Sequence, residues 1–189
     1  MSAIELRSTR RIDLRGAVLA AGVAALLLRV RVLQAPDVTR TWLLAALYAA
    51  ILAGSLLVPV PRDRPRIARP VALAVGLAAV ALAALGAGAP VPAPLGVQAL
   101  LLSALAAVAE EALFRRALYG WLERSGAAAA VLGSALLFAA IHVPLYGAPA
   151  LPVDLGAGLL FGWQRWAAGT WSVPATTHVA ANVLAVFLR

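Results

Sequence analysis

Two adjacent glutamates, Glu110 and Glu111, lie inside a stretch that otherwise has the composition of a membrane-spanning helix. A carboxylate at mid-membrane costs about 2.5–3.5 kcal/mol by insertion scales, so such acids usually face a polar cavity and serve a function. The only two histidines of the chain, His142 and His178, also lie in apolar segments. A carboxylate can act as a general base, and histidines can bind water or donate to an oxyanion. These four residues are therefore where we expect chemistry.

Glu111 is followed four residues later by Arg115, in the order that lets a carboxylate and a guanidinium pair along one helix face. Glu110 lies about 100° around the same helix, so Arg115 need not neutralise it. One carboxylate is then structural while the other is free. The alternative is a helix that has already ended, with all three charges solvated at the membrane rim. The apolar residues 117–122 that follow argue against this alternative.

The other candidate side chains also come in pairs with helical spacing. Phe138 and His142 lie one turn apart, and His178 and Asn182 repeat that spacing in the last apolar segment. Each pair also has a plain structural interpretation. A histidine just before Pro144 can be an interfacial residue, and a His–Asn pair can form hydrogen bonds between helices. Taken singly, these motifs are ambiguous.

The expected turns predict whether these side chains can meet. If Gly126 joins two antiparallel helices, Glu110 lies 16 residues before the turn and His142 lies 16 residues after it. With a rise of about 1.5 Å per residue, both lie roughly 24 Å from the turn. Gly169 is the expected turn before the last segment, and His178 lies nine residues beyond it. Convergence of the glutamate and the two histidines is therefore geometrically possible.

The composition indicates the fold class. The 189 residues are 63% hydrophobic and only 13% charged. A soluble domain of this size needs more polar residues to cover its surface. Long apolar runs without strand-like alternation predict an all-α integral membrane protein. Runs of roughly 20 apolar residues predict a bundle of about seven transmembrane helices. We place them at 14–32, 41–60, 71–89, 95–119, 127–143, 153–168 and 173–188, with a basic connector at 61–70 and a neutral turn at 90–94.

The charge of the chain indicates its surroundings and orientation. All 16 basic residues are arginines and the formal net charge is +8, but the arginines are dispersed between apolar runs. Dispersed charge favours contact with membrane lipids and argues against nucleic acid. With a cytoplasmic N-terminus, twelve arginines, among them Arg115 and Arg165, fall inside. Four fall outside, namely Arg29, Arg31, Arg40 and Arg189, so the positive-inside rule favours this orientation.

Taken in order, the motifs resemble those of a known family. The patterns EExxxR at Glu110–Arg115, FxxxH at Phe138–His142 and HxxxN at His178–Asn182 lie on successive apolar segments. This arrangement resembles the CPBP family of intramembrane glutamic proteases, also called the CAAX-processing, bacteriocin-processing or Abi family. The resemblance covers about residues 95–189. Two positions depart from the family pattern, with Ala107 in place of a proline and Arg116 in place of a glycine.

The resemblance implies an endopeptidase whose site residues we can name. Glu110 would be the catalytic glutamate that polarises a water molecule, and His142 would bind and orient that water. His178 and Asn182 would donate hydrogen bonds to the oxyanion. Glu111 and Arg115 would form a supporting buried pair, with Phe138 beside them. Neither a metal nor another cofactor is implied.

The same resemblance suggests an organisation and a substrate class. Residues 1–93 would form three family-variable helices, and residues 94–189 would form a four-helix catalytic core within one compact bundle. The arginine-rich, alanine-rich composition suggests a GC-rich bacterial source, hence the cytoplasmic (inner) membrane. The expected partner is a membrane-embedded or lipidated peptide or protein, such as a sorting tag or bacteriocin leader.

Three alternatives remain open from the sequence. A zinc protease could use His142, His178 and a glutamate as ligands, although no HExxH motif is present. A non-catalytic immunity or scaffold protein could keep the same fold. A small proton-coupled transporter is a third alternative, but the chain lacks the repeats typical of that class. The absence of cysteine excludes a thiol nucleophile and a cysteine-ligated metal.

Overall fold

The computed structural model describes residues 3–60, 63–86 and 96–187, which contain helices and connectors but no strand. Seven long helical rods run through these residues, in agreement with the seven predicted segments. The first three rods are α1 (Ala3–Val32), α2 (Asp37–Leu57) and α3 (Arg69–Gly86). The fourth consists of α4 (Val97–Glu111), the π-helix η1 (Ala112–Leu118), α5 (Tyr119–Leu122) and the 3-10 turn η2 (Glu123–Ser125). The last three are α6 (Ala127–Tyr146), α7 (Leu151–Ala168) and α8 (Ser172–Phe187), and the short 3-10 turn η3 (Ala148–Ala150) precedes α7.

Four of these rods are long and apolar enough to cross a membrane. They are α2, α3, the continuous rod Val97–Ser125, and α6. The predicted all-helical fold is therefore confirmed for the described residues, and these four rods are compatible with the predicted membrane protein. For α1, α7 and α8 a membrane-spanning role stays a prediction, because α8 is only 16 residues long and α7 carries Asp154, Gln164 and Arg165.

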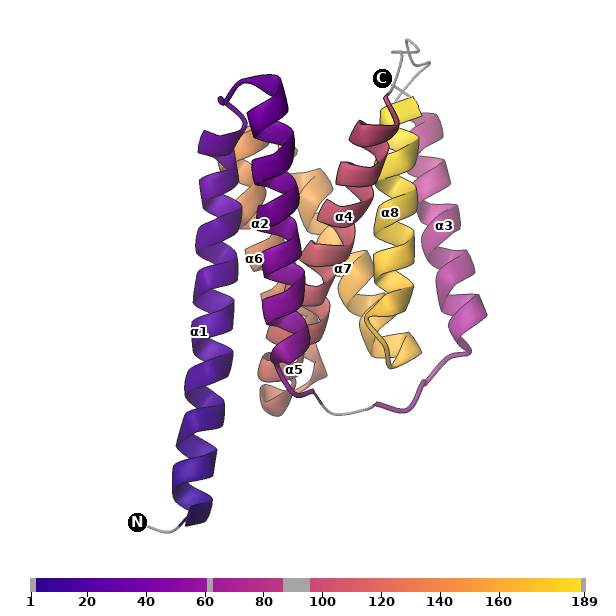
Figure 1. The fold of residues 1–189 in the computed structure, drawn as a ribbon. Coiled ribbons are helices and arrows are strands. Elements are labelled where there is room, and N and C mark those ends of the chain that lie inside the picture. The colour runs from indigo at the N-terminus through magenta and orange to yellow at the C-terminus, as the bar shows by residue number, and fades with distance from the viewer. Residues whose placement is uncertain (1–2, 61–62, 87–95, 188–189) are drawn as a thin grey trace.

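The rods form a bundle in which the fourth rod and α8 lie near the middle. In Figure 1, α1 and α2 lie side by side along one edge, and α3 stands at the opposite edge beside α8. The α4 helix packs against both α2 and α8, while α6 packs most extensively against α7. The glutamate-bearing helix therefore has neighbours from the N-terminal and the C-terminal parts of the chain.

Small residues allow α6 and α7 to approach closely. A Cβ atom added at Gly158 would lie 3.0 Å from the Cα atom of Ala135, and one at Gly162 would lie 3.2 Å from Cγ1 of Val131. Helices in a membrane associate through such packing because lipid offers no hydrophobic driving force. The glycines on α7 thus fix the distance to the helix that carries His142.

The turns fall where the sequence predicted them. Gly126 (φ 105°) separates η2 from α6, and Gly169 (φ 65°) ends α7. Both need a positive φ, which glycine adopts without steric cost. The predicted neutral turn at 90–94 and the predicted boundary between residues 93 and 94 lie outside the described residues.

The connector between α2 and α3 is fastened to the end of α7. The backbone N–H groups of Arg66 and Ile67 donate to the Ala167 carbonyl at 2.8 and 3.0 Å, which satisfies an otherwise free helix-end acceptor. Arg165, which we counted among the cytoplasmic arginines, is buried (3% exposed) and forms an ion pair with Asp63 of this connector. These contacts therefore join the α2–α3 connector to the C-terminal end of α7.

Candidate active site

The two glutamates lie at the junction between two kinds of helix. The α-helix ends at Glu111, and the next seven residues, Ala112–Leu118, form a π-helix. A π-helix has wider turns than an α-helix and is rare, and a large share of the known examples lie at functional sites. Both carboxylates are inside the protein, with Glu110 3% exposed and Glu111 fully buried. The alternative of a solvated helix end is therefore wrong.

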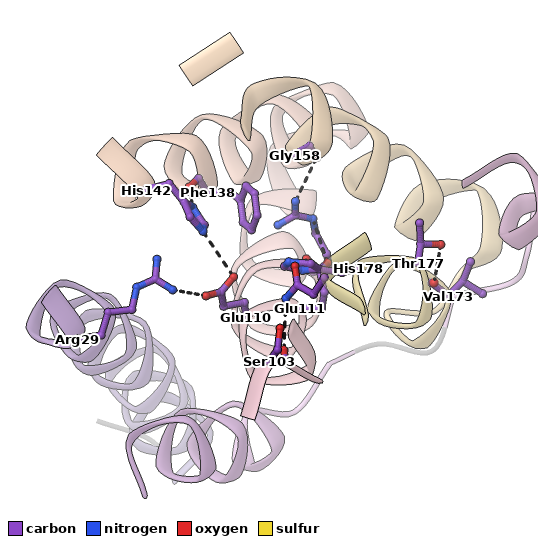
Figure 2. Close-up of polar contacts among 12 residues, drawn as sticks. Arg29, Ser103, Glu110, Glu111, Phe138, His142, Gly158, Val173, Thr177 and His178 are labelled. Atoms are coloured by element: carbon purple, nitrogen blue, oxygen red, sulfur yellow. Dashed lines mark hydrogen bonds and ion pairs between the residues drawn. The ribbon is translucent and has the colours of Figure 1, made fainter. Parts of the chain in front are cut away.

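Glu110 has a cation on one side and a histidine on the other. Nη1 of Arg29, from α1, donates to Oε1 of Glu110. Oε2 of Glu110 lies 3.7 Å from Nε2 of His142, on α6. Figure 2 shows these two side chains reaching Glu110 from different helices. The two carboxylate oxygens thus have different partners, and only one of them faces the histidine.

The second ring nitrogen of His142 is held by its own helix. Nδ1 lies 2.7 Å from the backbone carbonyl of Phe138. A carbonyl can only accept, so Nδ1 carries the proton in this contact. In the neutral ring, Nε2 then has a lone pair directed to the side of Glu110. This contact fixes both the orientation and the tautomer of the ring.

Glu111 connects three helices through its two oxygens. Oε2 lies 3.4 Å from Nε of Arg115, the predicted i,i+4 ion pair. Oε1 lies 3.0 Å from Nδ1 of His178 on α8. Arg115 in turn donates from Nη2 to the Gly158 carbonyl on α7 at 3.1 Å. Glu111 therefore supports the position of a predicted site histidine as well as that of the arginine.

Phe138 lies between the two histidines. Its ring centroid is 4.5 Å from that of His142 and 5.7 Å from that of His178. The guanidinium carbon of Arg115 lies 4.9 Å from the same ring, within the range of a cation–π contact. The predicted supporting role of Phe138 is consistent with this position, since the ring separates the two polar groups and packs against both.

A cavity of about 330 Å³ opens beside these groups. Four predicted site residues line it, namely Glu110, His142, His178 and Asn182. Other lining residues are Arg29, Tyr48, Ser103 and Tyr146. Asn182 also donates from Nδ2 to the Ser103 carbonyl at 3.3 Å. The structure therefore brings the acid, both histidines and the amide to one cavity, and the catalytic role of each stays a prediction.

Sequence reasoning missed Arg29. It follows an apolar run, so it has the appearance of a flanking charge, and we placed it on the outer side of the membrane. The residue is instead 4% exposed and paired with Glu110. One signal could have indicated it. Arg115 was not expected to neutralise Glu110, so the buried carboxylate needed a cation from a helix elsewhere in the chain.

The two departures from the family pattern have structural explanations. Ala107 is fully buried in α4, so a small side chain fits there. Arg116 donates from Nη1 to the carbonyls of Ser55 and Val58, the latter at 2.7 Å. These carbonyls lie at the end of α2, where backbone acceptors lack intrahelical partners. Arg116 thus fastens α2 to the π-helix.

The zinc alternative requires a cluster of ligands. A catalytic zinc normally has three protein ligands. Within the described residues, no group of three His, Cys, Asp or Glu side chains has a geometry that could hold a metal ion. His142 contacts Glu110 whereas His178 contacts Glu111, so each histidine has its own carboxylate.

The comparison with protein families agrees with the motifs. Residues 92–184 match the family described as type II CAAX prenyl endopeptidase Rce1-like. This match confirms the resemblance to the CPBP family that the sequence motifs indicated. It includes every predicted site residue, whereas Arg29 lies outside it. Comparisons with curated proteins and with solved structures found no match.

Proposed function

We propose that the chain is an intramembrane endopeptidase that hydrolyses a peptide bond with water activated by Glu110. The observation that carries this proposal is the 3.7 Å separation of Glu110 Oε2 from His142 Nε2. Both atoms are acceptors when the carboxylate is ionised and the ring is neutral with its proton on Nδ1. A water molecule between them can donate one hydrogen to each, which leaves its oxygen lone pairs directed away from both.

The reaction then follows general acid–base chemistry. The oxygen of this water attacks the carbonyl carbon of the peptide bond, and Glu110 takes the proton that the water loses. When the tetrahedral intermediate collapses, the C–N bond breaks and Glu110 returns the proton to the leaving amine. The products are a carboxylic acid and an amine, which exchange a proton in water to become a carboxylate and an ammonium, and Glu110 is ionised again. No redox step and no cofactor are needed.

His178 and Asn182 are proposed as donors to the oxyanion. Both line the cavity that contains Glu110. Nδ1 of His178 is engaged with Glu111, so Nε2 is the nitrogen left to donate, and the ring is then doubly protonated. The Glu111 carboxylate is placed to stabilise that charge. A preorganised donor of this kind typically contributes about 3 kcal/mol to transition-state stabilisation.

A hydrophobic groove supports a lipidated or membrane-embedded substrate. A second cavity of about 430 Å³ lies between α2 and α4, lined mainly by apolar side chains that include Val38, Trp42 and Leu101. Leu102 lines both this groove and the cavity at Glu110. An acyl or isoprenoid chain in the groove would therefore lie next to a peptide at the catalytic carboxylate.

The remaining parts of the proposal concern the membrane. All seven rods would cross it, with the N-terminus in the cytoplasm of a bacterial cell and residues 94–189 forming the four-helix catalytic core. The supporting observation is the density of arginines in the connector that precedes α3, at the end of the bundle where α2 finishes. The burial of Arg29 removes one arginine from the outer count and that of Arg115 and Arg165 removes two from the inner count, which leaves ten against three and keeps the bias.

The decisive experiment compares C-termini of membrane proteins in native-host cells that carry the wild type or Glu110→Gln at matched expression. We expect a small set of proteins to keep unprocessed ends in the Glu110→Gln cells, and this set identifies the substrates. Glu123→Gln is a matched control, because Glu123 is a partly exposed acid in η2 that lines neither the groove nor the cavity at Glu110. Identical C-termini in wild-type and Glu110→Gln cells would overturn the proposal and favour a non-catalytic binding protein of the same fold.

A further inference from the structure

Arg29 is the component of the site that the family motifs do not include. Arg29 is 4% exposed and lines the cavity beside Glu110. Nη1 donates to Oε1 of Glu110, while Nε and Nη2 are buried without a hydrogen-bond partner. A buried cation is costly, and the ion pair of Arg29 is with Glu110, so its place beside that carboxylate indicates a role beyond packing.

The sequence of α1 places this arginine at the level of Glu110. Gly22, Leu26 and Arg29 are all buried and recur at helical spacing, so they form one face of α1. Gly22 lies against Leu113 of the π-helix, and a Cβ atom there would come within 2.6 Å of a Leu113 methyl. The close contact sets the position of α1 against the π-helix, and Arg29, two turns further along α1, then meets the carboxylate.

The contact has two consequences for a general base. First, an ionised carboxylate inside a membrane protein is favoured by an adjacent cation, which offsets part of its desolvation. Second, Arg29 holds one carboxylate oxygen of Glu110, so the other oxygen is directed to His142. A carboxylate without this contact could turn away from the histidine.

We propose that Arg29 is a positioning residue that keeps Glu110 ionised and directs its Oε2 atom to the water-binding place beside His142. The inference rests on the proposed hydrolytic function. It makes α1 part of the catalytic apparatus, although α1 lies outside the residues that match the family.

Other titratable groups near Glu110 cannot replace this cation at neutral pH. Those on neighbouring helices are Tyr48 on α2, His142 on α6, Asp154 on α7 and His178 on α8. His142 is neutral in the proposed mechanism, and the charge of protonated His178 is engaged by Glu111. Arg115, on the same rod as Glu110, is engaged by Glu111. Arg29 is thus the permanent positive charge in contact with Glu110 among the described residues.

The test uses the full-length protein in lipid vesicles and a peptide from the set that Glu110→Gln leaves unprocessed. We would measure kcat and KM between about pH 5 and 9 for the wild type, Arg29→Met and Arg29→Lys. The matched control is Arg31→Met, because Arg31 is an exposed arginine two residues further along α1. A purely structural role would change the amount of active protein but not the shape of the pH profile.

Arg29→Met should lower kcat at neutral pH by about 100-fold, with KM changed by less than about threefold. Its acidic limb should move to higher pH, because Glu110 ionises less readily without the cation, so part of the rate returns at high pH. Arg29→Lys should lie between Arg29→Met and the wild type, and Arg31→Met should behave as wild type. An Arg29→Met profile with the wild-type shape, whatever its amplitude, would overturn the inference.

A second measurement covers the case in which Arg29→Met does not accumulate. Glu110→Gln removes the charge that Arg29 neutralises, so Arg29→Met/Glu110→Gln should accumulate better than Arg29→Met alone. No improvement in the double variant would overturn the inference as well. An active Glu110→Gln enzyme would instead overturn the proposed function. A failure of the proposed function is therefore distinguishable from a failure of the role given to Arg29.

Discussion

Oε1 of Glu111 lies 3.0 Å from Nδ1 of His178, so the helix of the paired glutamates and the last helix are joined by a hydrogen bond inside the bundle. The second oxygen of Glu111 faces Arg115, which itself reaches a backbone carbonyl of α7. One carboxylate thus organises three helices, whereas the neighbouring Glu110 faces the cavity. The two adjacent glutamates have different neighbours because successive residues on a helix point about 100° apart.

Arg115→Ala should reduce the amount of folded protein rather than only its turnover. The substitution leaves the fully buried Glu111 with His178 as its remaining partner, and that partner is charged only when protonated. Breaking a buried pair from one side typically costs about 3–5 kcal/mol. Accumulation in the membrane and thermal unfolding in detergent measure the effect. Arg124→Ala, at an exposed arginine, is the control, and normal levels of the Arg115 variant would contradict the structural assignment.

Gly158→Ala should destabilise the packing of α6 against α7. The new methyl would lie 3.0 Å from a backbone atom of Ala135, so the two helices must separate. Overpacking of this kind costs about 1–3 kcal/mol. Gly156→Ala is a matched control on the same helix, because a Cβ atom there meets nothing within 4 Å. Equal melting temperatures in detergent for the two variants would show that the helices do not pack as described.

Ala45→Trp should raise KM for a lipidated substrate by about tenfold or more while leaving kcat on a short soluble peptide little changed. Ala45 lines the groove between α2 and α4, and an indole there would fill much of the space proposed for a lipid chain. One methylene in an apolar pocket already contributes about 1 kcal/mol to binding. Exclusion of a longer chain should therefore raise KM by more than about tenfold. The control is Ala46→Trp, on the exposed side of the same helix. If both variants keep the wild-type KM, the substrate chain binds elsewhere.

Removal of metal should leave hydrolysis unchanged. The His and Glu side chains at the cavity pair with one another, and the described residues hold no three-ligand group. Activity after dialysis against a chelator, together with elemental analysis of the purified protein, measures this. Loss of activity that zinc alone restores would favour the metalloprotease alternative over general-base catalysis by Glu110.

The local parts of the site were accessible to sequence reasoning. The Glu111–Arg115 pair follows from helical spacing, and it persists although the backbone between the two residues changes from α to π. Turns at Gly126 and Gly169 follow from glycine at the ends of apolar runs. The equal distances of Glu110 and His142 from Gly126 predicted that they could meet, and they do.

The partners supplied by distant helices were not accessible in the same way. Arg29 and Arg165 are both buried and paired with acids 81 and 102 residues away. At the end of an apolar run an arginine looks the same whether it reaches lipid headgroups or turns inward to an acid. The choice depends on which helix face meets the bundle, and packing between helices determines that face.

The bond between the α2–α3 connector and the end of α7 has a consequence for biogenesis. Arg66 donates to the Trp166 carbonyl, 100 residues further along the sequence, and Asp63 forms an ion pair with Arg165, 102 residues further along. During synthesis the connector leaves the ribosome long before α7 exists, so its polar groups have only water or headgroups as partners at that stage. Closure of the connector onto α7 is therefore a late event in the synthesis of the chain, and until then α1 and α2 depend on their own hydrophobicity and on their contact with each other.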